Sequence, residues 1–404
     1  MFKLNAPLSL LPTYRLIYTI IVSMMLLSLP VFAERDCSEV SIDCGKTPSV
    51  IFDDTDRLWA IFVQGSHVYV TYSDDAGRAF STPTKVNAVA ETIDSNGENR
   101  PKIAVGLNGE IFLSWTQKTE TRFTGNIRFS RSLDAGKTFE TPKTINDDGL
   151  DVGHRFDQLY VSPKGLLYLA WLDKRDKAAA TAKGKKYRGS AVYYAVSTDA
   201  GKNFGKNHKI ADNSCECCRL TMAEASGEKV ALLWRHIFNT NTRDHAIATL
   251  TPNGTIEGLS RSTADEWKID ACPHHGPDLA YAGDGTYHQA WFSLGDNHKG
   301  LFYGRYSSKN GTHRVRAIDT SPGASHPQIA VLGNQLVYVW KLFDGKQASV
   351  QMVRSTDGGI TWSQASTVAS TQSGSDHPLL TTSTQALYLS WSTEQSYRFE
   401  RLKI

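Results

Sequence analysis

A pattern of apolar and polar positions recurs along this chain. In each copy a Pro or Arg opens an apolar strand, a Gly-containing turn follows, and a second apolar strand ends in an aromatic residue. Six copies end in tryptophan, at Trp115, Trp171, Trp234, Trp291, Trp340 and Trp391. A weaker first copy ends at Phe62, and successive closing aromatics lie 49 to 63 residues apart. That period suits a unit of four short antiparallel strands, and the repeat phase of the aromatics favours packing inside the fold over sugar stacking. The sequence therefore predicts an all-β propeller of seven four-stranded blades, each with its own core.

The last repeat contains three predicted strands, and the chain stops before a fourth. Residues 37–44, CSEVSIDC, offer an outer strand for this blade. Such pairing covers a free sheet edge and joins the two ends of the ring. Cys37 and Cys44 are the obvious first disulfide pair.

An eight-residue motif, Ser-x-Asp-x-Gly-x-x-aromatic, occurs between the third and fourth strands of four units. The copies are SDDAGRAF from Ser73, SLDAGKTF from Ser132, STDAGKNF from Ser197 and STDGGITW from Ser355. The Gly supplies a positive φ for the turn, and the Asp accepts hydrogen bonds from the turn backbone. The closing aromatics are expected to turn back into their own blades.

Four such motifs at one phase of the repeat resemble the Asp boxes of the sialidase superfamily of BNR-repeat propellers, over almost the whole mature chain. The resemblance implies a fold and not a reaction. It also implies that the Asp residues of the boxes lie on the outer rim, away from any active site. Sialidases of this family have six blades, which is the alternative to the seven counted here.

The first 33 residues have the layout of a cleavable signal peptide, with Lys3 and Arg15 before an apolar run that ends at Ala33. We expect the mature chain, residues 34–404, to form the propeller in the periplasm or outside the cell. It holds 42 Lys and Arg against 41 Asp and Glu. A nearly neutral chain gives no reason to expect a nucleic-acid partner, or a membrane partner after cleavage.

Candidate chemistry gathers in loops that a propeller brings to one face. Two cysteine-rich loops open the fourth and fifth units, SCECCR at 214–219 and ACPHHGP at 271–277. Their donors, predicted to form one cluster, are Cys215, Cys217, Cys218, Cys272, His274 and His275. Thiolate with imidazole suits copper or zinc, and soft sulfur favours copper. In an exported protein the same cysteines also form disulfides, so both readings stay open.

A second set of residues favours anion binding on the same face. Its members open the first strands of their units: Arg100, Arg155, Arg219, His326 and His377. Three convergent guanidinium groups bind a carboxylate, as the sialidase resemblance implies; ion pairing with acids is the alternative. No motif assigns catalytic residues, since Tyr397 with Glu394, and Asp157 or Asp173, are candidates by position only.

Three functions follow from these patterns. The preferred one is binding of a ligand or metal, copper first, at a Cys/His-rich central face. The alternatives are an exo-sialidase-type glycoside hydrolase and a protein-docking scaffold whose cysteines are all structural. A basic insertion at residues 173–189 is expected to be a mobile, solvated loop over this face. No organic cofactor is indicated, and the ligand classes considered are a metal, a small molecule or a sugar.

Overall fold

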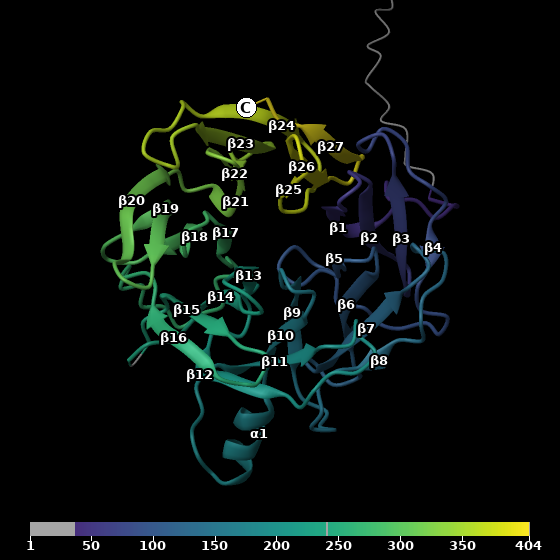
Figure 1. Ribbon diagram of the computed structural model, residues 1–404. Coiled ribbons are helices and arrows are strands. Elements are labelled where there is room, and N and C mark those ends of the chain that lie inside the picture. The colour runs from purple at the N-terminus through teal and green to yellow at the C-terminus, as the bar shows by residue number, and fades with distance from the viewer. Residues whose placement is uncertain (1–36, 240, 404) are drawn as a thin grey trace, which may run out of the picture. The chain divides into compact units, whose positions relative to one another are not determined.

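The computed structural model describes residues 37–239 and 241–403, which form seven antiparallel β-sheets arranged in a ring (Figure 1). In this part of the chain six sheets have four strands and the seventh has three. The seven-bladed all-β propeller is therefore confirmed. The predicted signal peptide, residues 1–33, lies outside the described residues. No helix among the described residues is long and apolar enough to cross a membrane.

Blades one to four contain the first sixteen strands. Blade one holds β1 (Lys46–Phe52), β2 (Leu58–Gln64), β3 (His67–Ser73) and β4 (Thr84–Lys85). Blade two holds β5 (Lys102–Val105), β6 (Ile111–Lys118), β7 (Gly125–Ser132) and β8 (Lys143–Thr144). Blade three holds β9 (His154–Val161), β10 (Leu167–Asp173), β11 (Ser190–Ser197) and β12 (His208–Ser214). Blade four holds β13 (Thr221–Glu224), β14 (Val230–Arg235), β15 (His245–Leu250) and β16 (Ile256–Arg261).

Blades five to seven complete the ring. Blade five holds β17 (Asp278–Tyr281), β18 (Thr286–Leu294), β19 (Lys299–Ser307) and β20 (Gly311–Asp319). Blade six holds β21 (Ala324–Leu332), β22 (Gln335–Phe343), β23 (Ala348–Ser355) and β24 (Ser366–Thr371). Blade seven holds β25 (Leu379–Thr382), β26 (Leu387–Ser392) and β27 (Tyr397–Arg401). The first strands line the centre, and each contacts the first strand of the next blade, with β25 against β1.

The apolar cores lie between blades and not within them. One cluster joins Phe112 of blade two to Leu167 of blade three, and another joins Trp234 of blade four to Tyr168 of blade three. The six repeat tryptophans are among the largest fully buried side chains. The expectation of a separate core in each blade is wrong, because a single twisted sheet has two faces and each needs a neighbouring sheet to cover it.

The Asp boxes fold as rim turns that also fasten neighbouring blades. In the second box the Ser132 hydroxyl donates to Asp134 at 2.7 Å and accepts from the Gly136 N–H at 2.9 Å. Gly136 has a φ of 75°, and a Cβ there would lie 2.7 Å from the Trp59 ring of blade one. The box aromatics follow the same rule, since Phe204 packs edge-on against Phe129 of the preceding blade. Phe204 therefore fills the joint between two blades, which corrects the expectation, and Trp362 contacts Tyr303 of the preceding blade as well as Tyr338 of its own.

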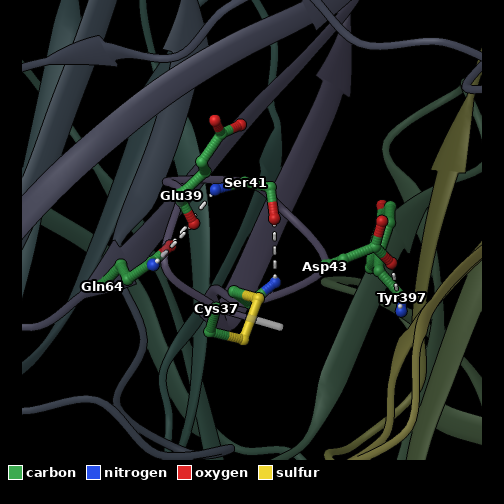
Figure 2. The surroundings of a disulfide bond; sticks show 7 residues. Cys37, Glu39, Ser41, Asp43, Gln64 and Tyr397 are labelled. Atoms are coloured by element: carbon green, nitrogen blue, oxygen red, sulfur yellow. Dashed lines mark hydrogen bonds between the residues drawn. A yellow bond between two sulfur atoms is a disulfide. The ribbon is translucent and has the colours of Figure 1, made fainter. Parts of the chain in front are cut away.

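The N-terminal segment does not complete blade seven. Residues 37–44 form a turn closed by the Cys37–Cys44 disulfide, and the described sheet of blade seven ends at β27. Figure 2 shows the contact that replaces the predicted strand: the Tyr397 N–H donates to the Asp43 carboxylate at 3.0 Å. The six residues between the cysteines form bends and a turn, so they do not extend along a strand. The pairing of Cys37 with Cys44 is confirmed.

The insertion in blade three is structured, contrary to the expectation of a mobile loop. It contains α1 (Arg175–Ala182), which projects from the ring in Figure 1. Lys174 and Lys177 contact the Glu216 carboxylate at 3.3 and 2.6 Å, and the Tyr193 hydroxyl donates to Asp176. The basic side chains have a specific acidic partner, and that partner lies within the cysteine loop.

Candidate functional site

Two neighbouring cavities lie where the first strands and their preceding loops meet. The axial cavity, of about 180 Å³, has Arg100, Lys102, Arg219 and Asp278 in its wall. The cysteine-histidine cavity, of about 570 Å³, is lined by residues from several blades, including Glu98, Cys217, Cys272, His274, His326 and His377. Most residues singled out from the sequence thus gather at one place in the fold.

The three arginines are each held by a carboxylate. Arg100 donates to Asp376 at 2.8 Å, and Arg219 donates to Glu98 at 2.6 Å. Arg100 and Arg219 line the axial cavity. Each bond joins distant parts of the chain, so the ion pairs fasten the ring across its centre.

Arg155 differs from the other two in position. It lines the cysteine-histidine cavity, donates to Asp94 through two nitrogens, and stacks over Phe156. The predicted row of convergent guanidinium groups is therefore divided between two cavities, and the ion-pairing alternative describes the contacts of all three.

The three cysteines of the first loop form one buried cluster, named here the thiol cluster. The Cys215 sulfur lies 3.7 Å from the sulfurs of both Cys217 and Cys218, and the three sulfurs lie within 4.8 Å of one another. None of the three is in a disulfide. Hydrogen bonds from the thiols of Cys217 and Cys218, with the nearby charges of two arginines, lower the pKa of Cys215.

Those two arginines, Arg235 and Arg243, are buried beside the thiol cluster. Arg243 contacts the Cys215 sulfur at 3.3 Å, and Arg235 donates only to backbone carbonyls and lies over the Trp267 ring. Among the described residues neither has a carboxylate within ion-pair distance. A buried cation needs a counter-charge. The Cys215 sulfur is the group placed to provide it, because its pKa is lowered, whereas burial and the neighbouring sulfurs raise the pKa of Cys217 and Cys218.

The second cysteine-rich loop does not join the thiol cluster as a unit. Cys272 and His274 are exposed and line the cysteine-histidine cavity, which Cys217 reaches from its buried side. Cys272 is not among the three sulfurs that lie within 4.8 Å of one another. His275 packs instead against Phe292 and His326. The predicted six-residue cluster is thus split into a buried group of three and donors on the cavity wall.

His326 and His377 form a stacked pair with ring centroids 3.4 Å apart. The Nε2 of His326 lies 3.1 Å from the His274 carbonyl, which makes Nε2 the protonated nitrogen and leaves a lone pair on Nδ1. Neither Nδ1 has a hydrogen-bond partner among the described residues. Burial lowers the pKa of His326 to about 3, so its ring is neutral and available as a ligand.

The positional candidates for catalysis are separated. The Tyr397 hydroxyl bonds Ser390 at 2.9 Å, while the Glu394 carboxylate accepts from the Gly374 N–H. Asp173 binds Trp171 and Arg175, and burial raises the pKa of Asp157, which accepts from Ser114. These contacts are structural, and none of the four residues lines the axial cavity or the cysteine-histidine cavity.

Sequence reasoning missed Glu98, Glu216 and the two buried arginines. Glu98 binds Arg219 and also accepts from the Gly276 N–H at 2.8 Å, so it joins the two cysteine-rich loops. Arg235 ends an apolar strand directly after Trp234, where a charged residue among buried ones was a usable signal. Glu216, between two buried cysteines, was another.

A family model for the BNR/Asp-box repeat matches residues 353–364, the fourth box. The solved structures include an ulvan lyase, a polysaccharide lyase bound to -[GlcA(1-4)Rha3S]-, with 13% identity and a TM-score of 0.56, covering 89% of this chain and 93% of that one. This chain is a seven-bladed β-propeller that carries Asp boxes. A search of curated protein sequences found no significant match.

Two further structures are similar to this Asp-box propeller at lower scores. The NanB sialidase from Streptococcus pneumoniae has 11% identity and a TM-score of 0.49, covering 76% of this chain and 67% of that one. An α-L-arabinanase from Penicillium chrysogenum has 15% identity and the same TM-score, 0.49, covering 76% and 93%. At these identities the likeness is one of fold.

Proposed function

We propose that this propeller binds a soft metal ion at the thiol cluster, with copper(I) favoured over zinc. The observation that carries the proposal is the spacing of the three buried sulfurs. Ligands about 2.3 Å from one ion lie about 3.8 Å apart in tetrahedral geometry and about 4.0 Å apart in trigonal geometry, whereas disulfide-bonded sulfurs lie about 2.05 Å apart. The 3.7 Å separations agree with a shared ion and not with a bond.

The charges around the thiol cluster support copper(I) in particular. Three thiolates and one monovalent ion carry a net charge of about −2, which the guanidinium groups of Arg235 and Arg243 offset. A divalent ion leaves one positive charge in excess. The hydrogen bond from Arg243 to the Cys215 sulfur would also hold this ligand in its orientation toward the ion.

The compartment proposed for this activity is the periplasm or the cell exterior. The Cys37–Cys44 disulfide supports an oxidising compartment. In such a compartment three adjacent thiols oxidise readily unless a ligand holds them. A bound soft ion is therefore also a reason for the thiol cluster to remain reduced.

The test is copper(I) binding by the reduced full chain, measured by competition with a chromophoric chelator. We expect one equivalent in the wild type and, for Cys217→Ser, an affinity at least about a hundredfold lower, because a ligand is lost. The double variant Cys37→Ser/Cys44→Ser is the matched control and should bind as the wild type does. If the protein instead prefers zinc to copper(I) more strongly than other thiolate sites do, zinc replaces copper(I) in the proposal and the site stays the same.

No bound ion, with Cys215, Cys217, Cys218 and Cys272 paired in disulfides, would contradict the proposal. That result would favour the scaffold alternative, in which the cysteines are structural and the central face docks a protein. Mass spectrometry after alkylation without reduction counts the free thiols directly.

A sugar ligand in the cysteine-histidine cavity is the second candidate. Phe123 is 55% exposed at the wall of this cavity, beside Arg155 and Lys174. An exposed ring beside two cations suits the apolar face and the carboxylate of an acidic sugar. The likeness of fold to an ulvan lyase supports this choice of ligand class. Calorimetry with uronate oligosaccharides should then show binding that Phe123→Ala removes, and turnover of a sialoside reporter tests the exo-sialidase alternative.

A further inference from the structure

The three sulfurs of the thiol cluster are not exposed to solvent. Its three cysteines are buried, and Glu216, the residue between Cys215 and Cys217, carries the contacts to Lys174 and Lys177 of the insertion. A metal ion cannot diffuse through packed protein, so a buried site needs an access path lined by donors.

Cys272 lies where two cavities that reach the thiol cluster meet. One is the cysteine-histidine cavity, which also contains Cys217. The other, the insertion cavity, has a volume of about 1080 Å³, runs beneath the basic insertion, and contains Arg243, the residue bonded to Cys215. Cys272 and Glu216 line both cavities. The exposed Cys272 therefore shares a cavity wall with Cys217, a buried member of the thiol cluster.

The same cavity holds further soft or borderline donors. His274 is exposed close to Cys272 in the sequence, and the rings of His326 and His377 line the wall. Their buried Nδ1 atoms accept or donate no hydrogen bond among the described residues, and that of His377 lies 3.7 Å from the Glu98 carboxylate. A neutral imidazole with a free lone pair is a copper ligand. The His377 ring occupies the space that a side chain at Gly97 would fill, since a Cβ there would lie 2.4 Å from the ring.

We propose that Cys272 is the uptake residue through which copper(I) reaches the thiol cluster, an inference that rests on the proposed function. The Cys272 thiol loses its proton to solvent and its sulfur binds copper(I), while a thiolate of the donor complex leaves and is free to take up a proton. The Cys217 thiol then loses its proton and binds the ion, while the bond from copper(I) to Cys272 breaks and the Cys272 sulfur takes up a proton again. Copper remains monovalent throughout, so no oxidant or reductant is needed.

A residue that only takes up the ion changes the rate of copper(I) loading, whereas a permanent ligand also changes the equilibrium affinity for copper(I). The experiment is stopped-flow transfer of copper(I) from its glutathione complex to the reduced full chain, followed by the thiolate–copper absorbance. Cys272→Ser should load about tenfold more slowly while the equilibrium affinity changes less than about twofold. The matched control is Asp270→Asn, which lines the insertion cavity but supplies no soft donor, and it should load at the wild-type rate.

Each other outcome has a definite meaning. Loading of Cys272→Ser at the wild-type rate overturns the inference and leaves the proposed function intact. An equal loss of rate and affinity also overturns it, because Cys272 is then a permanent ligand. If the wild type takes up no copper(I) at all, the proposed function itself has failed. Cys272 is exposed, so its replacement by Ser should fold, and an unchanged melting temperature checks this.

Discussion

Two consecutive residues of each Asp box have a positive φ, and they make opposite demands on the side chain. In the second box Ala135 has a φ of 56° and Gly136 has a φ of 75°. The first tolerates a Cβ, whereas the second lies against the Trp59 ring. The glycine of the box is needed for its conformation and for the close approach of blade one.

We predict that Gly136→Ala lowers the free energy of unfolding by about 1 to 3 kcal/mol, from backbone strain and the clash with Trp59. The matched variant Ala135→Gly removes a Cβ at the adjacent position and should leave stability unchanged or slightly higher. Urea unfolding measures both, and copper(I) affinity should be unchanged in each because the box lies on the rim. Equal stability of the two variants would contradict this reading of the box.

The carboxylates of the Asp boxes link stability to pH. Hydrogen bonds from the Thr138 hydroxyl and N–H, and from Ser132, lower the pKa of Asp134 from 3.8 to about 2. A lowered pKa in the folded state means that the stabilisation is present above about pH 4 and is lost as the pH falls toward 2.

We therefore expect Asp134→Asn to melt at a lower temperature than the wild type at pH 7. The difference should shrink between pH 4 and pH 2, where the wild type loses the same interaction. Asp270→Asn, outside the boxes, serves as the control. Melting curves recorded across this pH range test the prediction, and a difference that is constant with pH would count against it.

Single residues also show how far sequence reasoning reaches. The sequence placed Cys217, Cys272, His326 and His377 on one face because propeller loops alternate between faces, and these residues do line one cavity. Their partners were not found. Glu98 is two residues from Arg100 in sequence but binds Arg219, and such pairings depend on how blades meet across the ring.

At the scale of elements, ion pairs attach α1 and the residue before it to the cysteine loop at 214–219. The contacts of Lys174 and Lys177 with Glu216 are half-exposed, so they stabilise weakly and salt screens them. The sequence showed a charge-rich insertion but not its acidic partner, because Glu216 lies in a different blade connection. The predicted fourth strand of blade seven does not form at residues 37–44, because the disulfide between Cys37 and Cys44 favours a turn there.

We predict that Glu216→Gln frees the insertion without unfolding the ring. Trypsin should then cleave the insertion, at Lys183, Lys185 or Lys186, several times faster than in the wild type, because cleavage follows local opening. Glu257→Gln, which breaks a surface pair with Lys229 on another blade, is the matched control. Cleavage at the wild-type rate in Glu216→Gln would mean that the insertion is held by other contacts.

At the scale of the whole molecule, the ring closes without a shared sheet. Blade seven meets blade one through β25 and β1, through packing of Phe52 against Tyr388, and through hydrogen bonds from Thr384 to Asp56. The buried pair of Arg100 and Asp376 joins the loop before β5 of blade two to the loop before β25 of blade seven. Closure thus depends on packing and on ion pairs near the axis, beside the cavities proposed to bind ligand.

Removing one partner of that pair should weaken closure more than removing an exposed one. We expect Arg100→Met to cost about 3 to 5 kcal/mol, because Asp376 is left as a buried, unpaired charge. Arg57→Met, which breaks an exposed pair with Asp74 in blade one, should cost less than about 1 kcal/mol. Denaturant unfolding measures the free energy of unfolding of the two variants side by side. Similar losses in both would mean that the pair of Arg100 and Asp376 does not hold the ring closed.

The central claim is that one soft ion is shared by the sulfurs of Cys215, Cys217 and Cys218. X-ray absorption spectroscopy of the copper(I)-loaded protein tests it most directly, because it counts the ligand atoms and measures their distances. The account predicts three sulfur neighbours at about 2.3 Å in the wild type and fewer in Cys217→Ser. A first shell made only of nitrogen and oxygen would contradict it.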